Sequence, residues 1–259
     1  MTELSGVGGR RSEIERPWAR SASIPLLVVM LAIGGACSGT ERAGAADTSV
    51  VAAVGAPGEG TAPTPEPHAP TLRVVFIGTS LTAGLGLDPD SAYPARIQRK
   101  ADSAGLAVAV VNAGLSGETS AGALRRVDWL LQREPADVVV LETGANDGLR
   151  ALPVEATRAN IQAIVRRIKA AAPRARVVLV QMQAPPNLGA RYTSAFSGMF
   201  PSIAREEGLT LAPFLLDGVA GVARLNQADG VHPNDAGERR VADNVWRAIE
   251  PVLRAASTA

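Results

Sequence analysis

From residue 72 onward, short apolar runs alternate with longer amphipathic segments. The apolar runs are rich in β-branched residues, which is typical of β-strands. Their apolar character is nearly continuous, as expected for parallel strands whose two faces are both covered by helices. Five such runs predict strands, over Leu72–Ile77, Ala107–Val111, Asp137–Leu141, Arg176–Gln181 and Thr210–Pro213.

The segments between these runs have helical periodicity. Between residues 154 and 171, Ile161, Ile164, Val165 and Ile168 share one stripe, and charged residues lie off it. The alternation predicts one α/β domain over residues 72–259, with a doubly wound, five-stranded parallel sheet. Helices are predicted over Tyr93–Ser103, Ser120–Gln132, Val154–Ala171, Tyr192–Glu206 and about Ala236–Arg254.

Residues 1–37 have the pattern of an export signal. An arginine-rich stretch precedes the apolar run from Ile24 to Ala36. This run is short for a bilayer span but suits the apolar core of a signal peptide. Two processing routes stay open, namely cleavage after Ala45 or lipidation of Cys37. We therefore expect an exported protein in the periplasm or cell envelope, with a lipid anchor if Cys37 is modified.

Residues 38–71 predict a disordered linker between the export signal and the domain. Gly, Ala, Thr and Pro dominate this stretch, which lacks the apolar side chains that a core requires. The linker contains His68, one of only two histidines in the chain. A tether of this kind suits an envelope enzyme, although a passive spacer would have the same composition.

The overall composition excludes several classes of protein. A net charge of +1 provides no basic surface for nucleic acid. The single cysteine rules out an intramolecular disulfide, and no cluster of Cys and His suggests zinc. We therefore expect no metal, no cofactor and no nucleic-acid partner, and we expect a monomer.

Two distant segments together contain the groups needed for acyl transfer. Ser80 follows the first predicted strand, and Asp229 and His232 lie close together far downstream. A serine, a histidine and an aspartate can act as nucleophile, base and orienting group. Because His68 lies in the linker, a histidine base would be His232. Parallel strands gather chemistry at their carboxyl ends, and the segment 229–232 must reach that edge for a site to form.

Each of these residues also has a purely structural interpretation. Ser80 fits a helix cap or turn, and Asp229 and His232 fit an ordinary turn. The nucleophile-elbow pattern G-x-S-x-G is only half met, since Thr82 stands at its last position. After Pro233, Asn234 or Asp235 can cap the last helix, and Asp235 with Glu238 resembles a capping box.

Two further loops offer groups that can stabilise an oxyanion. Gly117 follows the second predicted strand, where its N–H can approach a ligand closely. Asn146 follows the third strand and carries a side-chain amide that can donate. Turn formation is the alternative for both residues. Asp147 is a second candidate for the triad acid, but Asp229 ranks higher because it neighbours His232.

These four segments, in this order, resemble the conserved blocks of the SGNH (GDSL-like) hydrolase family. The blocks are Gly-Asp-Ser-Leu, a glycine, Gly-x-Asn-Asp and Asp-x-x-His, and the resemblance covers roughly residues 72–253. It is closest to the branch of bacterial acyl-CoA thioesterase I / lysophospholipase L1 and the arylesterases. The segments that carry it are Gly78–Leu81, Asn112–Ser120, Glu142–Arg150 and Asp229–Asn234.

The resemblance implies a flavodoxin-like three-layer α/β/α sandwich without a metal. It implies that Ser80 is the nucleophile and that His232 is the base, oriented by Asp229. The oxyanion hole would comprise the N–H groups of Ser80 and Gly117 and the Asn146 amide. Thr79 stands where the family usually has aspartate. This departure bears on loop rigidity and substrate preference and leaves the reaction class unchanged.

The predicted function is hydrolysis of carboxylic esters or thioesters through an acyl-enzyme. Aryl and alkyl esters, lysophospholipids and acyl thioesters are the expected substrates. The alternatives are a carbohydrate O-acetylesterase of the same family and a non-catalytic exported module of flavodoxin-like fold. An acyl groove is predicted from apolar loop residues, which would otherwise only support the loops: Leu81, Leu85, Leu87, Leu149, Leu152 and Pro185-Pro186.

Overall fold

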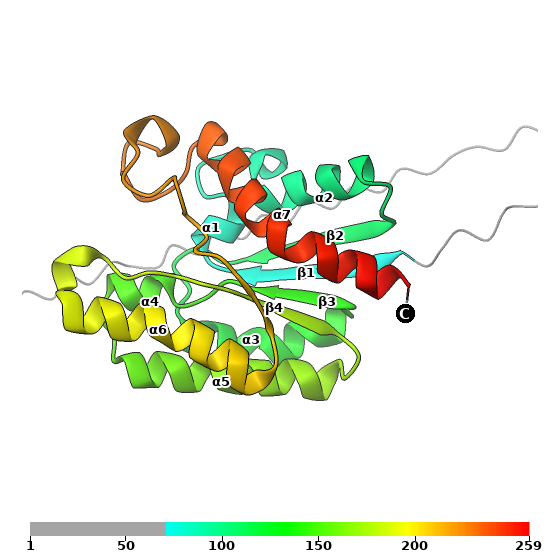
Figure 1. Ribbon diagram of the computed structural model, residues 1–259, viewed down its shortest axis with the longest axis horizontal. Helices are drawn as coiled ribbons and strands as arrows, with labels where there is room; N and C mark the ends of the chain where they lie inside the picture. The colour runs from blue at the N-terminus through cyan, green and yellow to red at the C-terminus, as the bar shows by residue number, and fades with distance from the viewer. Residues whose placement is uncertain (1–70, 259) are drawn as a thin grey trace, which may run out of the picture. The chain divides into compact units, whose positions relative to one another are not determined.

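The computed structural model describes residues 71–258, and they form a parallel sheet with helices on both faces (Figure 1). The five strands lie in the order β2-β1-β3-β4-β5 and every neighbouring pair is parallel. The predicted flavodoxin-like α/β architecture is therefore confirmed. The strands are β1 (Leu72–Gly78), β2 (Val108–Gly114), β3 (Val138–Leu141), β4 (Arg176–Val180) and β5 (Thr210–Ala212).

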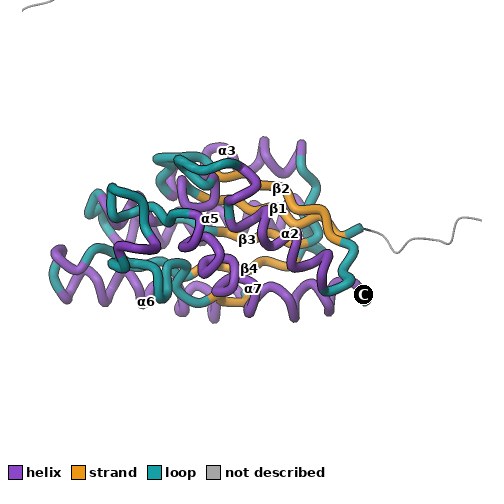
Figure 2. The backbone as a smooth tube through the Cα atoms, turned by 90° about the horizontal axis from the view of Figure 1, so that it is seen from above, coloured by secondary structure: helices purple, strands orange, loops and turns teal. Residues whose placement is uncertain are grey.

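Two layers of helices sandwich the sheet. Helices α2 and α7 pack together on one face, and α3, α5 and α6 pack on the other (Figure 1). The view from above in Figure 2 shows β2, β1, β3 and β4 side by side in that order. Within residues 71–258, no helix is both long and apolar enough to cross a membrane. The helices are α1 (Ser80–Ala83), α2 (Tyr93–Ser103), α3 (Ser120–Arg133), α4 (Ala145–Leu149), α5 (Val154–Ala171), α6 (Ala190–Glu207) and α7 (Asp235–Ser257), with 3₁₀ turns at Pro89–Ser91, Pro186–Leu188 and Ala223–Leu225.

The central strands explain why their sequences lack alternation. Val74, Val75, Phe76 and Ile77 of β1 are all fully buried, as is the whole of β3. Successive side chains of a strand point to opposite faces, so burial on both faces requires apolar residues at every position. The continuous apolar runs thus follow from the three-layer packing.

The sequence predicted the long elements well and missed the shortest ones. The bounds of α2 and α5 agree with the prediction, and those of the other long elements differ by a few residues at most. Helices α1 and α4 were absent from the prediction because single turns are too short to show a periodic stripe. Helix α1 follows β1 and helix α4 follows β3 after short connections, and predicted site residues lie in both helices.

The predicted export signal and nearly all of the linker lie outside the described residues. This applies to Cys37 and to the possible cleavage point after Ala45, as well as to His68. The division into signal, linker and domain at residues 37 and 71 therefore stays a prediction.

Candidate active site

Ser80 is the first residue of α1 and follows β1 after a single connecting residue, Thr79. Thr79 is the N-cap, and its hydroxyl accepts weakly from the N–H of Leu81 at 3.4 Å. Ser80 is 8% exposed, so its hydroxyl is sheltered yet reachable. As the first helical residue, Ser80 has no acceptor for its N–H within α1, which leaves this donor available.

The loop before α7 brings His232 to Ser80. His232 Nε2 lies 2.9 Å from Ser80 Oγ, across a sequence separation of 152 residues. His232 Nδ1 lies 2.6 Å from a carboxylate oxygen of Asp229. With Asp229 as acceptor at Nδ1–H, Nε2 is free to accept the Ser80 hydroxyl proton. The segment 229–232 thus reaches the carboxyl edge of the sheet.

The main chain of its own loop holds the carboxylate of Asp229 in place. Its second carboxylate oxygen accepts from the N–H groups of Val231 at 2.9 Å and His232 at 3.0 Å. The hydrogen bond from the His232 N–H, followed by that from the His232 ring, lowers the pKa of Asp229 to about 2. Asp229 is therefore ionised throughout the ordinary pH range and can stabilise a positive charge that forms on His232.

The two predicted oxyanion donors lie at the same cavity as Ser80 and His232. Gly117 has φ of +77°, a conformation that glycine adopts without strain. Asn146 lies in the single turn of α4, and its Nδ2 donates to the carbonyl of Glu118 at 3.0 Å. An amide nitrogen has two hydrogens, so one remains for an oxyanion.

An ion pair that sequence reasoning missed supports the Gly117 loop. The buried Glu118 carboxylate receives two hydrogen bonds from the Arg126 guanidinium, at 2.6 and 2.7 Å. Arg126 also donates to the carbonyl of Ala113 at the end of β2. Bidentate pairs of this kind fix geometry well. Nothing in the spacing of these residues indicated their pairing.

A second missed residue, Glu142, is fully buried beneath the turn that carries Ser80. Its carboxylate accepts from the Thr79 N–H at 2.7 Å and from the Thr79 and Thr82 hydroxyls at 2.9 Å each. The Thr82 hydroxyl also bonds the Tyr93 hydroxyl at 2.8 Å. Burial raises the pKa of Glu142 above its usual range, although the hydrogen bonds from Thr79 oppose the shift.

This network gives Thr79 a definite task in the turn. An aspartate at position 79 would face the Glu142 carboxylate, and two carboxylates in contact resist joint ionisation. The Thr79 hydroxyl instead donates to Glu142. Glu142 in turn holds the main chain of Thr79 directly beside Ser80.

Asp147, the competing candidate for the acid, does not meet His232. Its carboxylate accepts from the N–H and hydroxyl of Ser120, at 2.8 and 2.6 Å. The Thr157 hydroxyl donates to the same carboxylate at 3.3 Å. Asp147 thus joins α4 to the start of α3 and to α5, which is a structural task.

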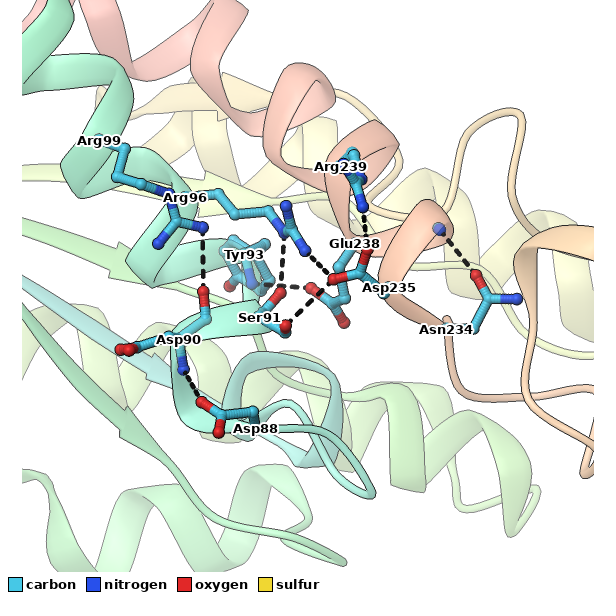
Figure 3. Close-up of polar contacts among 11 residues, drawn as sticks. Asp88, Asp90, Ser91, Tyr93, Arg96, Arg99, Asn234, Asp235, Glu238 and Arg239 are labelled. Atoms are coloured by element: carbon cyan, nitrogen blue, oxygen red, sulfur yellow. Dashed lines mark hydrogen bonds and ion pairs between the residues drawn. The ribbon is translucent and has the colours of Figure 1, made fainter.

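Asn234 is the N-cap of α7, and the predicted capping box between Asp235 and Glu238 is wrong. The Asn234 side chain accepts from the N–H of Gly237 at 3.0 Å. With the cap at Asn234, Glu238 is one position too late to complete a box. It points inward and accepts from the Tyr93 N–H at 2.7 Å (Figure 3).

The first turns of α2 and α7 are joined by further polar contacts, which Figure 3 shows. Asp235 accepts from the guanidinium groups of Arg96 and Arg239 and from the Ser91 hydroxyl at 3.0 Å. Arg96 also donates to the carbonyl of Ser91 at 2.8 Å. Because α7 starts shortly after His232, these contacts anchor the downstream end of the His232 loop.

The buried carboxyl group of Glu238 predicts that the stability of the fold depends on pH. Burial raises its pKa from 4.5 to about 8. A group whose pKa is raised in the folded state contributes to the free energy of unfolding. This contribution is fully present below pH 4.5 and is lost as the pH rises towards 8. Urea unfolding should therefore show that the free energy of unfolding of Glu238→Gln, relative to that of the unaltered protein, rises by up to about 5 kcal/mol between pH 4.5 and 8, at ~1.4 kcal/mol per pH unit.

The matched control is Glu250→Gln, which removes a carboxylate from an ion pair with Arg254 on the same helix. Glu250→Gln should change the free energy of unfolding by less than about 1 kcal/mol at either pH. Identical pH slopes for Glu238→Gln and the unaltered protein would contradict the assignment.

The cavity at Ser80 has a volume of about 480 Å³ and mainly apolar walls. Among the predicted groove residues, Leu81, Leu85, Leu149, Pro185 and Pro186 line it. Leu87 and Leu152 take no part, so that part of the prediction is wrong. Wall residues that sequence reasoning missed come from the segments after β4 and β5 and from the His232 loop: Met182, Ala184, Phe214, Leu216, Ala220 and Val231.

A larger hollow of about 620 Å³ lies between α2 and α7, away from Ser80. Its charged walls are largely ion-paired already, since Lys100 contacts Asp243 at 2.6 Å and Arg96 contacts Asp235. Within residues 71–258, no group of three or more His, Cys, Asp or Glu side chains is placed to hold a metal ion. The cavity at Ser80 is the one lined by Ser80, His232, Gly117 and Asn146 together.

This chain is similar to known proteins both in sequence and in fold. The GDSL-like lipase/acylhydrolase family model matches residues 76–240. Esterase TesA of Pseudomonas aeruginosa is 42% identical over 190 residues, which covers 73% of this chain and 92% of the relative. The thioesterase 1/protease 1/lysophospholipase L1 of Escherichia coli is 34% identical over 180 residues, covering 70% and 84%. A crystal structure of TesA, 39% identical, superposes with a TM-score of 0.67 and covers 70% of this chain and 99% of that one.

Proposed function

This chain belongs to the GDSL-like lipase/acylhydrolase family and is a carboxylic ester hydrolase, and we propose that Ser80, His232 and Asp229 form its catalytic triad. The carrying observation is the continuous contact from Asp229 through His232 to the Ser80 hydroxyl, at 2.6 and 2.9 Å. This contact opens onto an apolar cavity that also holds Gly117 and Asn146. Membership in an enzyme family sets aside the non-catalytic alternative.

In the proposed acylation step, Ser80 Oγ attacks the substrate carbonyl carbon while His232 Nε2 takes the hydroxyl proton. The ionised Asp229 stabilises the positive charge that His232 acquires. The N–H groups of Ser80 and Gly117 and the Asn146 amide face the oxygen on which negative charge develops. The protonated His232 then gives its proton to the departing alcohol or thiol, and the acyl group stays on Ser80.

In the proposed deacylation step, water takes the place of the departed alcohol. His232 removes a proton from this water, whose oxygen attacks the acyl-enzyme. The same three donors stabilise the second tetrahedral intermediate. Collapse of that intermediate returns the proton to Ser80 and releases a carboxylic acid.

The cavity favours acyl groups larger than acetyl. Its walls are formed by leucine, methionine, proline and phenylalanine side chains that bury methylene groups. A buried methylene contributes ~0.8 kcal/mol, or roughly a fourfold gain in kcat/KM. We therefore propose aryl and alkyl esters and lysophospholipids as the accessible substrates, with hydrolysis of acyl thioesters as an activity measurable in vitro. The carbohydrate O-acetylesterase is the alternative within the family.

A chain-length series tests this substrate assignment. With p-nitrophenyl acetate, butyrate, hexanoate and octanoate, kcat/KM should rise by up to about fourfold per methylene until the cavity is filled. Ser80→Ala provides the background rate for each ester. Highest kcat/KM on acetate, with a steady decline on longer chains, would contradict the assignment and favour the O-acetylesterase.

The cellular location is a separate part of the proposal. The N-terminal pattern supports export, so we propose that the enzyme acts in the periplasm or cell envelope, where activated thioesters of the cytoplasm are out of reach. Lipidation at Cys37 would tether it there, whereas cleavage after Ala45 would release it.

A further inference from the structure

Gln227 lies between the loops that carry the proposed nucleophile and base. Its side-chain Nε2 donates to the carbonyl of Leu85 at 2.7 Å and to the carbonyl of Pro233 at 2.9 Å. Leu85 belongs to the turn that follows α1, and Pro233 directly follows His232. The amide nitrogen therefore donates one hydrogen bond to each of the two loops.

The main chain completes this connection on both sides. The N–H of Gln227 donates to the carbonyl of His232 at 2.7 Å, and the N–H of Leu85 donates to the carbonyl of Ser80 at 3.1 Å. A hydrogen-bonded path thus runs from the main chain of Ser80 through Leu85 and Gln227 to the main chain of His232. This path is separate from the side-chain contact between Ser80 and His232.

Gln227 itself stays out of the reaction. It is half-buried and takes no part in lining the cavity at Ser80. Any effect that it has on turnover must therefore pass through the residues that it holds. We propose that Gln227 is a positioning residue that sets the separation between Ser80 Oγ and His232 Nε2, an inference that rests on the proposed roles of Ser80 and His232.

Catalysis needs this separation to be controlled. Ser80 and His232 lie on different loops, and the side chain of Asp229, which orients His232, is 47% exposed. Productive geometry must be kept within about 0.5 Å, and a misplacement of ~1 Å can cost up to about 10²-fold in rate. The hydrogen bonds of Gln227 to both loops, here called the Gln227 tie, supply that control without contacting substrate.

The test removes both donors while keeping the length of the side chain. Gln227→Met has no donor, and Gln227→Glu would direct a carboxylate at two carbonyl oxygens. For both variants, kcat on p-nitrophenyl butyrate should fall about 10-fold to 100-fold while KM stays within about twofold. A purely structural role would lower the folded fraction and leave kcat per folded molecule unchanged.

Gln98→Met is the matched control. The Gln98 amide also joins two segments, through the carbonyl of Val108 and the N–H of Val110, but it does so at the start of β2. That end of the strand lies at the edge of the sheet opposite Ser80, so kcat should be retained. Gln227 variants with unchanged kcat, or an equal loss of kcat in Gln98→Met, would overturn the proposal.

Hydrogen exchange of the segment 80–87 gives a readout that needs no activity. Gln227→Met should accelerate exchange in this segment, and Gln98→Met should leave it unchanged. If Ser80→Ala kept full turnover, the proposed role of Ser80 would be wrong, and hydrogen exchange would still test the role of Gln227. Unchanged exchange in Gln227→Met would contradict the role of Gln227 even if the triad is correct.

If the Gln227 variants fold poorly, Gly86→Ala perturbs the Gln227 amide from the turn that follows α1. A Cβ at residue 86 would meet Gln227 Oε1 at 2.5 Å, at a φ of +80°. Gly105→Ala has a similar φ of +69° and open space around the added carbon. Loss of kcat in Gly86→Ala alone supports the proposal, and equal kcat in the two variants contradicts it.

Discussion

Ser80→Ala is expected to reduce ester turnover by about 10⁴–10⁶-fold, the range typical for loss of a serine nucleophile. Without Oγ no acyl-enzyme can form, and His232 has no hydroxyl to activate. The fold should persist, because the only side-chain hydrogen bond of Ser80 among the described residues is the one to His232. Only uncatalysed attack by water, aided by the oxyanion donors, would remain.

The measurement combines kcat/KM with mass spectrometry of a covalent adduct. An organophosphonate probe should add one adduct to the unaltered protein and none to Ser80→Ala. Ser116→Ala, which removes an exposed serine from the neighbouring Gly117 loop, is the control and should label normally. Labelling that persisted in Ser80→Ala would exclude Ser80 as the nucleophile.

Asn146→Ala should lower kcat by about 10²–10³-fold, which corresponds to ~3–4 kcal/mol of lost transition-state stabilisation. The Asn146 amide faces the cavity beside Ser80 and Gly117 and anchors itself on the carbonyl of Glu118. Negative charge develops on the substrate oxygen only during the reaction. The effect should therefore appear in kcat, with KM changed by no more than a few-fold.

Asn160→Ala is the matched control for this prediction. The Asn160 amide donates to the Ser120 hydroxyl at the start of α3, and Asn160 does not line the cavity. Thermal unfolding separates any general loosening from a loss of oxyanion stabilisation. Full turnover in Asn146→Ala, or an equal loss in Asn160→Ala, would remove Asn146 from the oxyanion hole.

Much of the fold followed from local patterns. The strands and the long helices were readable because burial on both sheet faces demands continuous apolar runs, and burial of one helix face demands a periodic stripe. The single turns α1 and α4 were not readable, since a four- or five-residue helix contains too few positions to show a stripe. The capping box failed because two adjacent residues, Asn234 and Asp235, were both acceptable caps.

The candidate site was predicted unevenly. The structure brings together Ser80, His232, Asp229, Gly117 and Asn146, which the sequence proposed because each stands in a short segment with a known chemistry. Their supporting residues were missed, although Glu142 and Arg126 hold the loops on which that chemistry depends. Leu87 and Leu152 were wrongly placed in the groove because apolar character alone does not reveal which way a loop residue points.

By itself, the sequence determined the α/β class and the order of the elements, because these depend on local patterns. It also proposed the chemical groups of the site, because histidine is scarce in this chain. Only the tertiary structure decided that His232 reaches Ser80 at 2.9 Å, that Thr79 pairs with the buried Glu142, and that Gln227 joins the two loops. These contacts link residues more than 60 positions apart. No periodicity encodes such pairs, since the packing of whole strands and helices brings them together.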